Sequence, residues 1–522
     1  APSPISYGNY TFNWYNPATS AWVADQANLQ EAGITEGTAG NFGSQNLIKT
    51  RGAVLQDSVF QDRLVTTFGW RHDDNYNKFQ KASALLPNGY DFDYGAMDGW
   101  RQDWAYRQGD TTTKGAVLKP FRGFKAIDSM AGSGGAAGFV GGLLRGFDVH
   151  YNKSDSFVPD VPAISVTLEQ LPNPTSTGDD YGFSLNLLDG KFVLRANRYT
   201  TAQINTRNGQ FGTFGQRVLR LDIQSFAGNN DTFSLQRVAR LWVAAANPTF
   251  TTAQVDSAVY TIMKIPADQV ATYNGSTIGE TQDVTAKGDE IELNYNPDRF
   301  ITLRANVTKT QSIDANVAPH IPAWVALRTP TWTSIIDPRS GTPWFDTVYD
   351  STGTPTTTGT ATAHTFLTGN VTSPINLAQA TQGKSRPEIR EWHYSLSASL
   401  RLAKYSEQRF LKNVNVGGSL RWESKGAIGY YGIPINGDYS IATAFDPNRP
   451  IYAKANTYVD AFVTYSTRFF GDKVRARFQL NARNLQEWKA HLEPVGAYPD
   501  GSAHTFRVIE PMSLIFSSTF DL

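Results

Sequence analysis

One stretch of the sequence alternates apolar and polar residues so regularly that it restricts the fold more than any other feature. Residues 390–424 contain two such segments, separated by a short polar hinge at 405–409. The apolar positions are Trp392, Tyr394, Leu396, Ala398, Leu400 and Leu402 in the first segment, and Val414, Val416, Leu420 and Trp422 in the second. Successive side chains of a β-strand point to opposite faces of its sheet. The pattern therefore predicts two strands that share one apolar face and one polar face.

The same alternation recurs along the chain and predicts about thirteen strands bounded by turn residues. Their ranges are 46–60, 62–73, 113–121, 144–154, 180–188, 190–200, 281–296, 299–311, 389–404, 410–424, 456–469, 473–487 and 505–522. Residues 5–15 form a possible additional strand. Such a number of strands predicts an all-β fold.

The connections between these strands alternate between very short and very long. Short hinges are expected at 61–62, 188–190, 297–298, 405–409 and 471–472. Long loops are expected at 74–112, 155–179, 201–280, 312–388, 425–455 and 488–504. Outer-membrane barrels have short turns on the periplasmic side and long loops outside the cell. The exception is 122–143, where a short turn is expected but a glycine-rich insertion, DSMAGSGGAAGFVGG, is present.

A lipid-facing wall explains both the alternation and the asymmetry of the connections. In hydrocarbon every backbone donor and acceptor must be paired, so a spanning sheet closes on itself and turns its apolar residues outward. Leu303 would then face lipid and its neighbour Thr302 a wet interior. A soluble β-sandwich also alternates, but it has no reason to keep one end trimmed. The sequence therefore predicts an antiparallel transmembrane β-barrel with long extracellular loops.

Composition excludes several other classes. Lys plus Arg and Asp plus Glu both number 47 in the 522 residues, so the basic surplus that nucleic acid requires is missing. The chain has no cysteine, which excludes disulfides and thiolate metal sites. No stretch approaches the roughly 18 consecutive apolar residues of a transmembrane helix. The first residues, APSPISYGNY, lack the features of a signal peptide, so we expect that one was removed or that the gene product starts earlier.

The loop at 201–280 is expected to contain helices. Leu235, Val238, Ala239, Leu241 and Trp242 recur at helical spacing, with Asp231 as the expected N-cap. A second run contains Val255, Val259 and Ile262 before Pro266. Packing of these apolar stripes within the loop or on the barrel rim is the favoured interpretation, and a ligand pocket is the alternative.

The end of the chain carries the most specific signal. The segment PMSLIFSSTFDL alternates up to Leu522 and is similar to the terminal strand of bacterial outer-membrane barrels, although many of these end in Phe. RFQLNARNLQEW (477–488) resembles the penultimate-strand motif of TonB-dependent outer-membrane receptors. Stretches at 60–73, 179–201, 280–311, 390–402 and 499–501 resemble the large receptors of this family from Verrucomicrobia-like bacteria.

The resemblance implies a 22-stranded barrel filled by an N-terminal plug, which a short TonB-binding box precedes. This sequence has no plug-like segment and about half of those strands, so it is similar to the C-terminal part of such a receptor. We expect an extracellular loop and possible strand at 1–45 and barrel strands at 46–522. Expected partners are outer-membrane lipid, the plug and remaining strands on the same gene product or another chain, and the TonB complex through that missing part.

Residues that could carry function fall into three groups. Exposed aromatic residues in the loops are candidate ligand contacts, although interfacial belts and loop cores use the same residue types; they are Trp100, Trp104, Tyr106, Trp324, Trp332, Trp344, Tyr430 and Tyr431. Arg304, Arg401, Arg421 and Glu423 are expected to face the lumen or contact a plug. Asp91, Asp93 and Asp98 form a weak calcium candidate, with a solvated acidic loop as the alternative.

No catalytic constellation is recognisable. The seven histidines form no metal-binding spacing, and no nucleophile elbow or phosphate-binding loop occurs. The glycines at 132–142 are better explained by a flexible or close-packed turn than by a phosphate cradle. We therefore expect no enzyme, no resident metal and no cofactor.

Two functions remain open at this stage. The resemblance implies active uptake across the outer membrane of a Gram-negative bacterium, in which external loops capture a scarce solute such as a siderophore, cobalamin or an oligosaccharide, and a plug gates transport. The alternative is a structural or adhesive surface assembly whose loops bind a partner.

Overall fold

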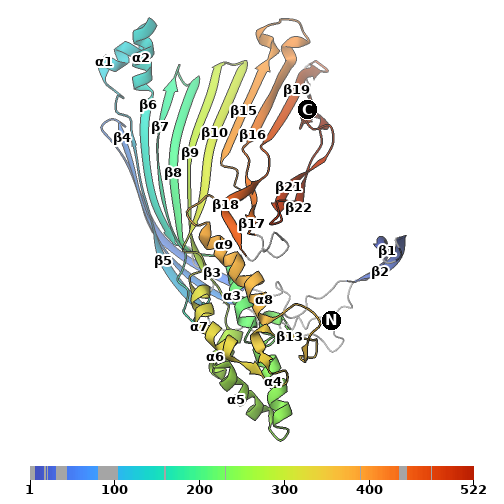
Figure 1. Cartoon of the computed structure of the whole chain (residues 1–522). Coiled ribbons are helices and arrows are strands. Elements are labelled where there is room, and N and C mark those ends of the chain that lie inside the picture. The colour runs from blue at the N-terminus through green and yellow to red at the C-terminus, as the bar shows by residue number, and fades with distance from the viewer. Residues whose placement is uncertain are drawn as a thin grey trace. The chain divides into compact units, whose positions relative to one another are not determined.

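Figure 1 shows the computed structural model of the chain. It describes residues 6–16, 19, 21–30, 44–79, 104–157, 160, 162–229, 231–387, 389–433, 444–471 and 473–521. The chain divides into two compact units, of which the first comprises Ala1–Arg51, His72–Gly109 and Ala227–Asn229. The second comprises Gly52–Arg71, Asp110–Phe226 and Asn230–Leu522.

The first unit contains an antiparallel hairpin of β1 (Ser6–Asn16) and β2 (Ala21–Gln30). Its first strand confirms the possible strand at 5–15. Polar contacts also join two segments of this unit, because the Thr50 hydroxyl donates a hydrogen bond of 2.7 Å to Asp73.

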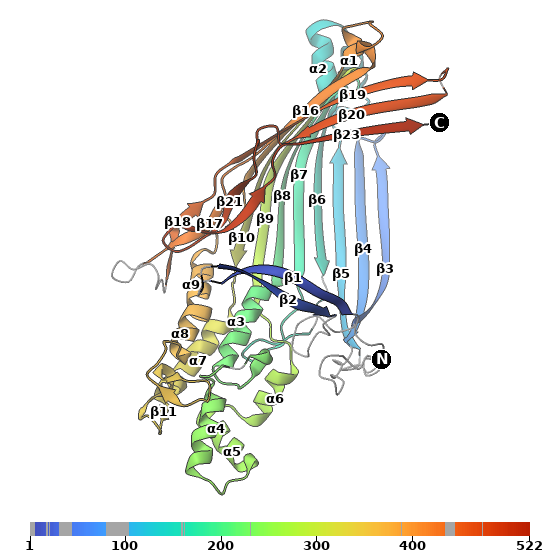
Figure 2. The same cartoon turned by 90° about the vertical axis from the view of Figure 1, so that its right-hand side faces the viewer.

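Thirteen antiparallel strands form the main sheet, in the order β23-β20-β19-β16-β15-β10-β9-β8-β7-β6-β5-β4-β3. They are β3 (Ser44–Val59), β4 (Leu64–Phe79), β5 (Ala105–Leu118), β6 (Phe147–Phe157), β7 (Thr175–Leu187), β8 (Phe192–Arg207), β9 (Thr281–Asp298), β10 (Ile301–Ala315), β15 (Trp392–Arg401), β16 (Val414–Glu423), β19 (Asn456–Phe469), β20 (Val474–Arg483) and β23 (Ser513–Asp521). Every predicted strand is present in the predicted order, and Figure 2 shows several of them side by side.

The register keeps apolar residues on one face from strand to strand. Directly paired residues of an antiparallel sheet lie on the same face. One continuous row across six strands consists of Leu303, Ala398, Gly418, Ala461, Ala482 and Leu514. We call the side of Leu303 the apolar face and the side of Thr302 the polar face. The single-strand alternation is therefore a property of the whole sheet.

Connections differ between the two ends of the strands in the second unit. The turn between β7 and β8 is short, and Leu188, Asp189 and Gly190 all have positive φ there. Only Arg299 and Phe300 join β9 to β10. At the opposite end, long connections carry helices α3 to α9, whereas α1 and α2 lie at the end with short turns (Figure 1). This is the predicted asymmetry.

The connections contain the remaining elements. The helices are α1 (Lys125–Ala131), α2 (Gly135–Arg145), α3 (Gly209–Arg220), α4 (Leu235–Ala246), α5 (Thr252–Met263), α6 (Ala267–Gly275), α7 (His320–Ser334), α8 (Ala363–Leu367) and α9 (Ser373–Ala380), with short helical turns at Phe226–Gly228, Trp344–Asp346, Thr368–Thr372, Leu402–Lys404 and Leu411–Asn413. The hairpins are β11 (Ile336–Asp337) with β12 (Thr342–Pro343), β13 (Val348–Tyr349) with β14 (Pro355–Thr356), β17 (Ala427–Gly432) with β18 (Phe445–Tyr452), and β21 (His491–Ala497) with β22 (Ala503–Ile509). Among the described residues, no helix is long and apolar enough to cross a bilayer.

Several boundaries differ from the predictions. β8 continues to Arg207 and β5 begins at Ala105, because their polar ends extend past the alternating segments. The segment expected as one strand at 505–522 is divided between β22 and β23. The predicted cap Asp231 was wrong: Ser234 is the N-cap of α4, and Asp231 instead accepts hydrogen bonds from Arg220 at 2.5 and 2.6 Å.

The hydrophobic core of the second unit lies in the long connections and not along the sheet. The main cluster of buried apolar residues comes from the segments 166–278 and 317–375. Fully buried members include Val218, Leu235, Val259 and Trp332. This agrees with the interpretation of the helical stripes as loop packing. The long connections at this end of the sheet therefore form a folded region, which we call the helical cap (residues 208–280 and 316–387).

Candidate functional site

The apolar face of the sheet is exposed along several neighbouring strands. Leu396 on β15, Leu420 on β16, Val463 on β19 and Leu480 on β20 are 41–47% exposed. Phe516 on β23 is 66% exposed. A soluble protein rarely exposes a continuous apolar surface of this extent. A sheet layer covering these residues is absent among the described residues, so the sandwich alternative does not fit.

Aromatic side chains gather at both margins of this face. Trp392, Tyr394 and Trp422 pack together at the margin nearer the helical cap, with centroid distances of 6.0 and 5.1 Å. At the other margin, Phe192 packs on Tyr295, and Phe410 on Tyr465. Between these margins β15 is 10 residues long, which matches the roughly 9–11 residues of a tilted membrane-spanning strand. Paired aromatic girdles are typical of outer-membrane barrels.

The polar face contains the four charged residues predicted for the lumen. Arg304 pairs in register with Ser397, Arg401 with Asn415, and Arg421 with Ser395, while Glu423 pairs with His393. A hollow of about 550 Å³ on this face is lined by Arg304, Ser419, Asp460, Asn481 and Arg483, among others. Contact of these residues with a plug stays a prediction.

A polar network fastens one loop hairpin to this face. Glu493 on β21 is 6% exposed and accepts hydrogen bonds of 2.5 Å from both Arg390 and Arg507. Asn456 donates to both Glu493 and Glu423, at 2.8 Å each. Burial alone would raise the pKa of Glu493, but the hydrogen bonds from Asn456 and Arg507 hold it below its usual value. Glu423 is thus part of a structural network that the sequence pattern did not reveal.

Three of the predicted loop tryptophans are buried in the helical cap. Trp332 and Trp344 are 0% exposed and Trp324 is 6% exposed. Trp344 donates a hydrogen bond of 2.9 Å to the carbonyl oxygen of Phe233. These side chains therefore occupy the loop core, the alternative role considered for them, and form no surface that a ligand can reach from outside.

Asp222 organises the centre of this core. Its carboxylate is 0% exposed and accepts hydrogen bonds from Arg328 at 2.6 and 3.2 Å and from Trp332 at 3.0 Å. Burial raises the pKa of Asp222, and the nearby Arg328 guanidinium opposes that shift. Because three donors satisfy the carboxylate, the arrangement joins α7 to the turn after α3.

The other predicted aromatics differ in exposure. Tyr430 is buried at 8%, and burial raises its pKa. Tyr431 is half-buried beneath the Arg449 guanidinium, 4.6 Å from its ring. In the first unit, Trp104 and Tyr106 are 38% and 46% exposed; Lys78 lies 4.8 Å from the Trp104 ring, and Tyr106 donates a hydrogen bond to Asp74.

Some predicted residues lie outside the described residues. These are Trp100 and the calcium candidates Asp91, Asp93 and Asp98. Within the part of the chain that the structure describes, no group of three or more His, Asp or Glu side chains is arranged to hold a metal ion.

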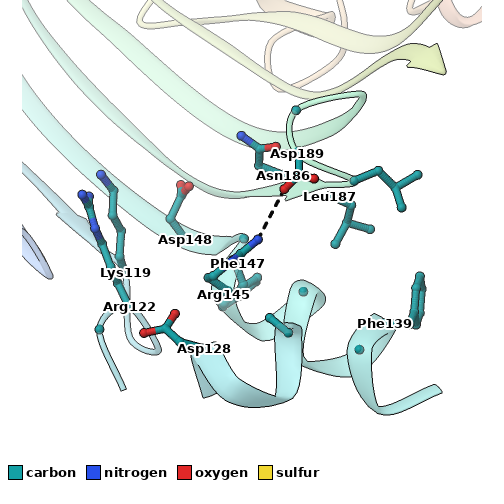
Figure 3. A pocket seen from close by; sticks show the side chains of 17 residues that line it. Lys119, Arg122, Asp128, Phe139, Arg145, Phe147, Asp148, Asn186, Leu187 and Asp189 are labelled. Carbon is teal, nitrogen blue, oxygen red and sulfur yellow. Dashed lines mark hydrogen bonds and ion pairs between the residues drawn. The ribbon is translucent and has the colours of Figure 1, made fainter. Parts of the chain in front are cut away.

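A cavity of about 850 Å³ lies at the short-turn end, between the α1–α2 hairpin and the turn after β7 (Figure 3). Arg145 reaches Asp189 across it at 3.5 Å. Its charged lining is balanced, with the cations Lys119, Arg122 and Arg145 and the carboxylates Asp128, Asp148 and Asp189. The charge of this lining therefore favours neither an anionic nor a cationic ligand.

The glycine-rich insertion forms this helical hairpin by close packing. A Cβ on Gly141 would lie 2.3 Å from the backbone nitrogen of Ala131, and one on Gly138 would lie 1.8 Å from the carbonyl oxygen of Ser133. The glycines thus bring two helices together, and the alternative of a flexible turn does not fit.

The motif at 477–488 has a clear structural role. Asn484, directly after β20, has a φ of 52°, a conformation that asparagine tolerates better than most residues. Its backbone N–H donates to Asp460 at 3.0 Å and its side chain to the carbonyl oxygen of Glu510 at 3.2 Å. Beyond it, Trp488 is 79% exposed. It was not among the predicted loop aromatics, because the strand predicted at 473–487 reached up to it, whereas β20 ends at Arg483.

Comparisons with known proteins gave structural matches only. No family model and no curated protein matches the sequence. The ferric preacinetobactin receptor BauA from Acinetobacter baumannii is 12% identical with a TM-score of 0.45, and the match covers 98% of this chain and 50% of BauA. The ferric-catecholate import receptor Fiu from E. coli K12 is 11% identical with a TM-score of 0.43, covering 91% and 45%. The copper transporter OprC is 9% identical with a TM-score of 0.41, covering 97% and 51%.

The chain thus spans about half the length of the solved chains that it matches.

Proposed function

We propose that this chain forms the C-terminal part of the wall and the external loops of a TonB-dependent uptake receptor in the outer membrane of a Gram-negative bacterium. One observation carries this proposal. A single antiparallel sheet has an exposed apolar face with aromatic margins and a polar opposite face, with short turns at one end and a folded helical cap at the other. Lipid covers the apolar face, and the polar face lines the lumen.

The polar face is suited to surround a gate. Arg304, Asp460 and Arg483 line its hollow without forming any constellation of nucleophile and base. Charged and amide groups of this kind make reversible hydrogen bonds to another protein segment. In our proposal that segment is the plug, supplied by the same gene product or by another chain, and the TonB complex acts through it.

Capture of the solute takes place outside the membrane. Among the described residues of the predicted set, Trp104, Tyr106 and Tyr431 are accessible, and Trp488 is a further candidate. Aromatic faces stack on sugar rings and on flat chelates. The proposed substrates are therefore a siderophore, cobalamin or an oligosaccharide, bound without covalent chemistry.

Growth and uptake by a strain that lacks the gene test this function. Iron, cobalamin or a complex glycan is limited in turn, and uptake of the labelled solute is followed with and without a protonophore. We expect one limitation to slow the growth of the mutant and the protonophore to abolish uptake by the wild type. Normal growth under all three limitations, combined with loss of attachment to surfaces or other cells, would favour the adhesive alternative.

A further inference from the structure

A band of cations interrupts the apolar face just beyond its aromatic margin on the side of the helical cap. On β8 the last apolar residue of the apolar face is Ala196, and the next residue on that face is Arg198. On β10 Lys309 follows Val307 on the apolar face in the same way. On β9, Lys287 lies on the same face, beyond Ile291. The apolar residues therefore give way to charged ones at one level on three adjacent strands, with Arg198, Asp289 and Lys309 in one row and Lys287 in the next.

The strand register brings these side chains into one place. Arg198 pairs with Asp289, which in turn pairs with Lys309. Lys287 pairs with Thr200 on one side and Gln311 on the other. Together these residues line a shallow cavity of about 380 Å³. We call Arg198, Lys287 and Lys309 the basic site.

The charges of the basic site are only partly neutralised. Arg198 donates hydrogen bonds of 2.6 and 3.1 Å to Asp289. The Lys309 ammonium lies 5.3 Å from the Trp392 ring. Lys287 is exposed and has no ion-pair partner within 4 Å among the described residues. Two ammonium groups therefore remain available to an anion, whereas the Arg198 guanidinium is held by Asp289.

The surroundings identify the level of the site relative to a bilayer. In the row that contains Arg198 and Lys309, the aromatic residues Tyr151, Tyr181 and Trp392 stand on the same face. Tyrosine and tryptophan concentrate at the boundary between hydrocarbon and headgroups. Lys114 and Lys153 lie one row further from the apolar residues, where Lys153 pairs with Asp179 at 3.6 Å. The site therefore stands where lipid phosphates are found.

We propose that the basic site binds the phosphate of an anionic lipid headgroup in the outer leaflet, with the acyl chains of that lipid lying on the apolar face below. This inference rests on the proposed function, because the position of the helical cap outside the cell assigns this margin to the outer leaflet. Phosphate monoesters present several oxygen acceptors to the ammonium groups of Lys287 and Lys309.

Native mass spectrometry of lipid binding tests the inference. The protein is purified from its own outer membrane, reconstituted into phosphatidylcholine bilayers and compared with and without diphosphoryl lipid A, with inorganic phosphate as a separate arm. The test variant is Lys287→Gln/Lys309→Gln. The control is Arg195→Gln/Arg477→Gln, which removes two cations from the polar face of β8 and β20. Insertion into phosphatidylcholine alone is measured first by protease protection of the strands.

We expect the test variant to bind lipid A about 30-fold more weakly, because each lysine near an anionic surface contributes roughly fivefold in affinity. The control should bind like the wild type, and added salt should weaken binding by the wild type. Equal binding of lipid A by the test and control variants overturns the inference. Displacement of lipid A by inorganic phosphate at millimolar concentration also overturns it, because it indicates a site for the free anion. Failure of the wild type to insert overturns the proposed function instead.

Discussion

Leu303 and Thr302 are adjacent in the sequence but experience different surroundings. Leu303 stands on the apolar face between Ala398 and Tyr295, whereas Thr302 lines the hollow on the polar face. We predict that Leu303→Arg destabilises the wall by about 2–4 kcal/mol, because it places a charge in hydrocarbon, and that Thr302→Arg is tolerated. Urea unfolding of the protein in lipid vesicles measures the difference. Equal effects of the two substitutions would mean that the faces are assigned wrongly.

The Asp222–Arg328 pair shows how much one residue contributes to the helical cap. Arg328→Met leaves the Asp222 carboxylate buried with only the Trp332 N–H as a donor. Breaking a buried pair in this way costs about 3–5 kcal/mol. As a control, Arg240→Met removes a more accessible pair with Asp256 at 2.7 Å, for which we expect about 0.2–1 kcal/mol. Hydrogen exchange of α4 and α7 reports both effects, and similar protection in the two variants contradicts this prediction.

At the scale of secondary structure, two adjacent glycines of the α1–α2 hairpin have different surroundings. We predict that Gly141→Ala opens the hairpin, because the new methyl group would overlap the backbone of Ala131. Gly142 has no neighbour within 4 Å of such a group, so Gly142→Ala should stabilise α2 by roughly 0.5–1 kcal/mol. Limited proteolysis of residues 125–145 should accelerate in the first variant only. Acceleration in both variants would contradict the close-packing explanation, because a methyl group on Gly142 meets no neighbour.

The start of α7 provides a pH dependence. His320 contacts Glu280 at 3.0 Å and Glu169 at 3.5 Å. The hydrogen bond with Glu280 raises the pKa of His320, against an opposing effect of burial. A raised pKa means that the pair stabilises the fold fully below the unfolded value of about 6.5 and loses this contribution as pH rises through the folded value.

We therefore predict that the helical cap is more stable at pH 6 than at pH 8. Denaturant midpoints followed by tryptophan fluorescence measure this difference, because Trp242, Trp324, Trp332 and Trp344 lie in the core of the cap. His320→Gln should reduce the difference between the two pH values. A variant that keeps the full pH dependence would assign it to another group.

Strands could be predicted from this sequence better than caps and loops. Alternation correctly predicted the faces of Leu303 and Arg304, because this signal depends only on the neighbouring residues in the sequence. Asp231 looked like a helix cap, yet it pairs with Arg220, a partner fixed by tertiary contact. Likewise, Trp332 and Trp344 are indistinguishable from exposed aromatics in the sequence, because burial depends on helices more than a hundred residues away. The basic site escaped prediction because it exists only when β8, β9 and β10 are aligned.

For the whole molecule, the proposed lipid contact distinguishes two classes of tryptophan. Trp392 is 37% exposed on the apolar face, whereas Trp344 is 0% exposed in the helical cap. We predict that brominated lipids quench part of the protein fluorescence and that Trp392→Phe reduces the quenched fraction. Trp344→Phe should leave that fraction of the remaining signal unchanged or larger. Loss of quenching only in the second variant would place the cap, and not the sheet, in the membrane.

The position of the hydrophobic core has a consequence for biogenesis. If the sheet spans the outer membrane, residues 208–280 and 316–387 pass through it before their apolar side chains can meet. They must cross as an extended polypeptide, because a formed helical domain would not fit a closing pore. Once outside, burial of these side chains makes the return crossing unfavourable. In the proposed membrane arrangement, folding of the cap would thus fix the orientation of the protein.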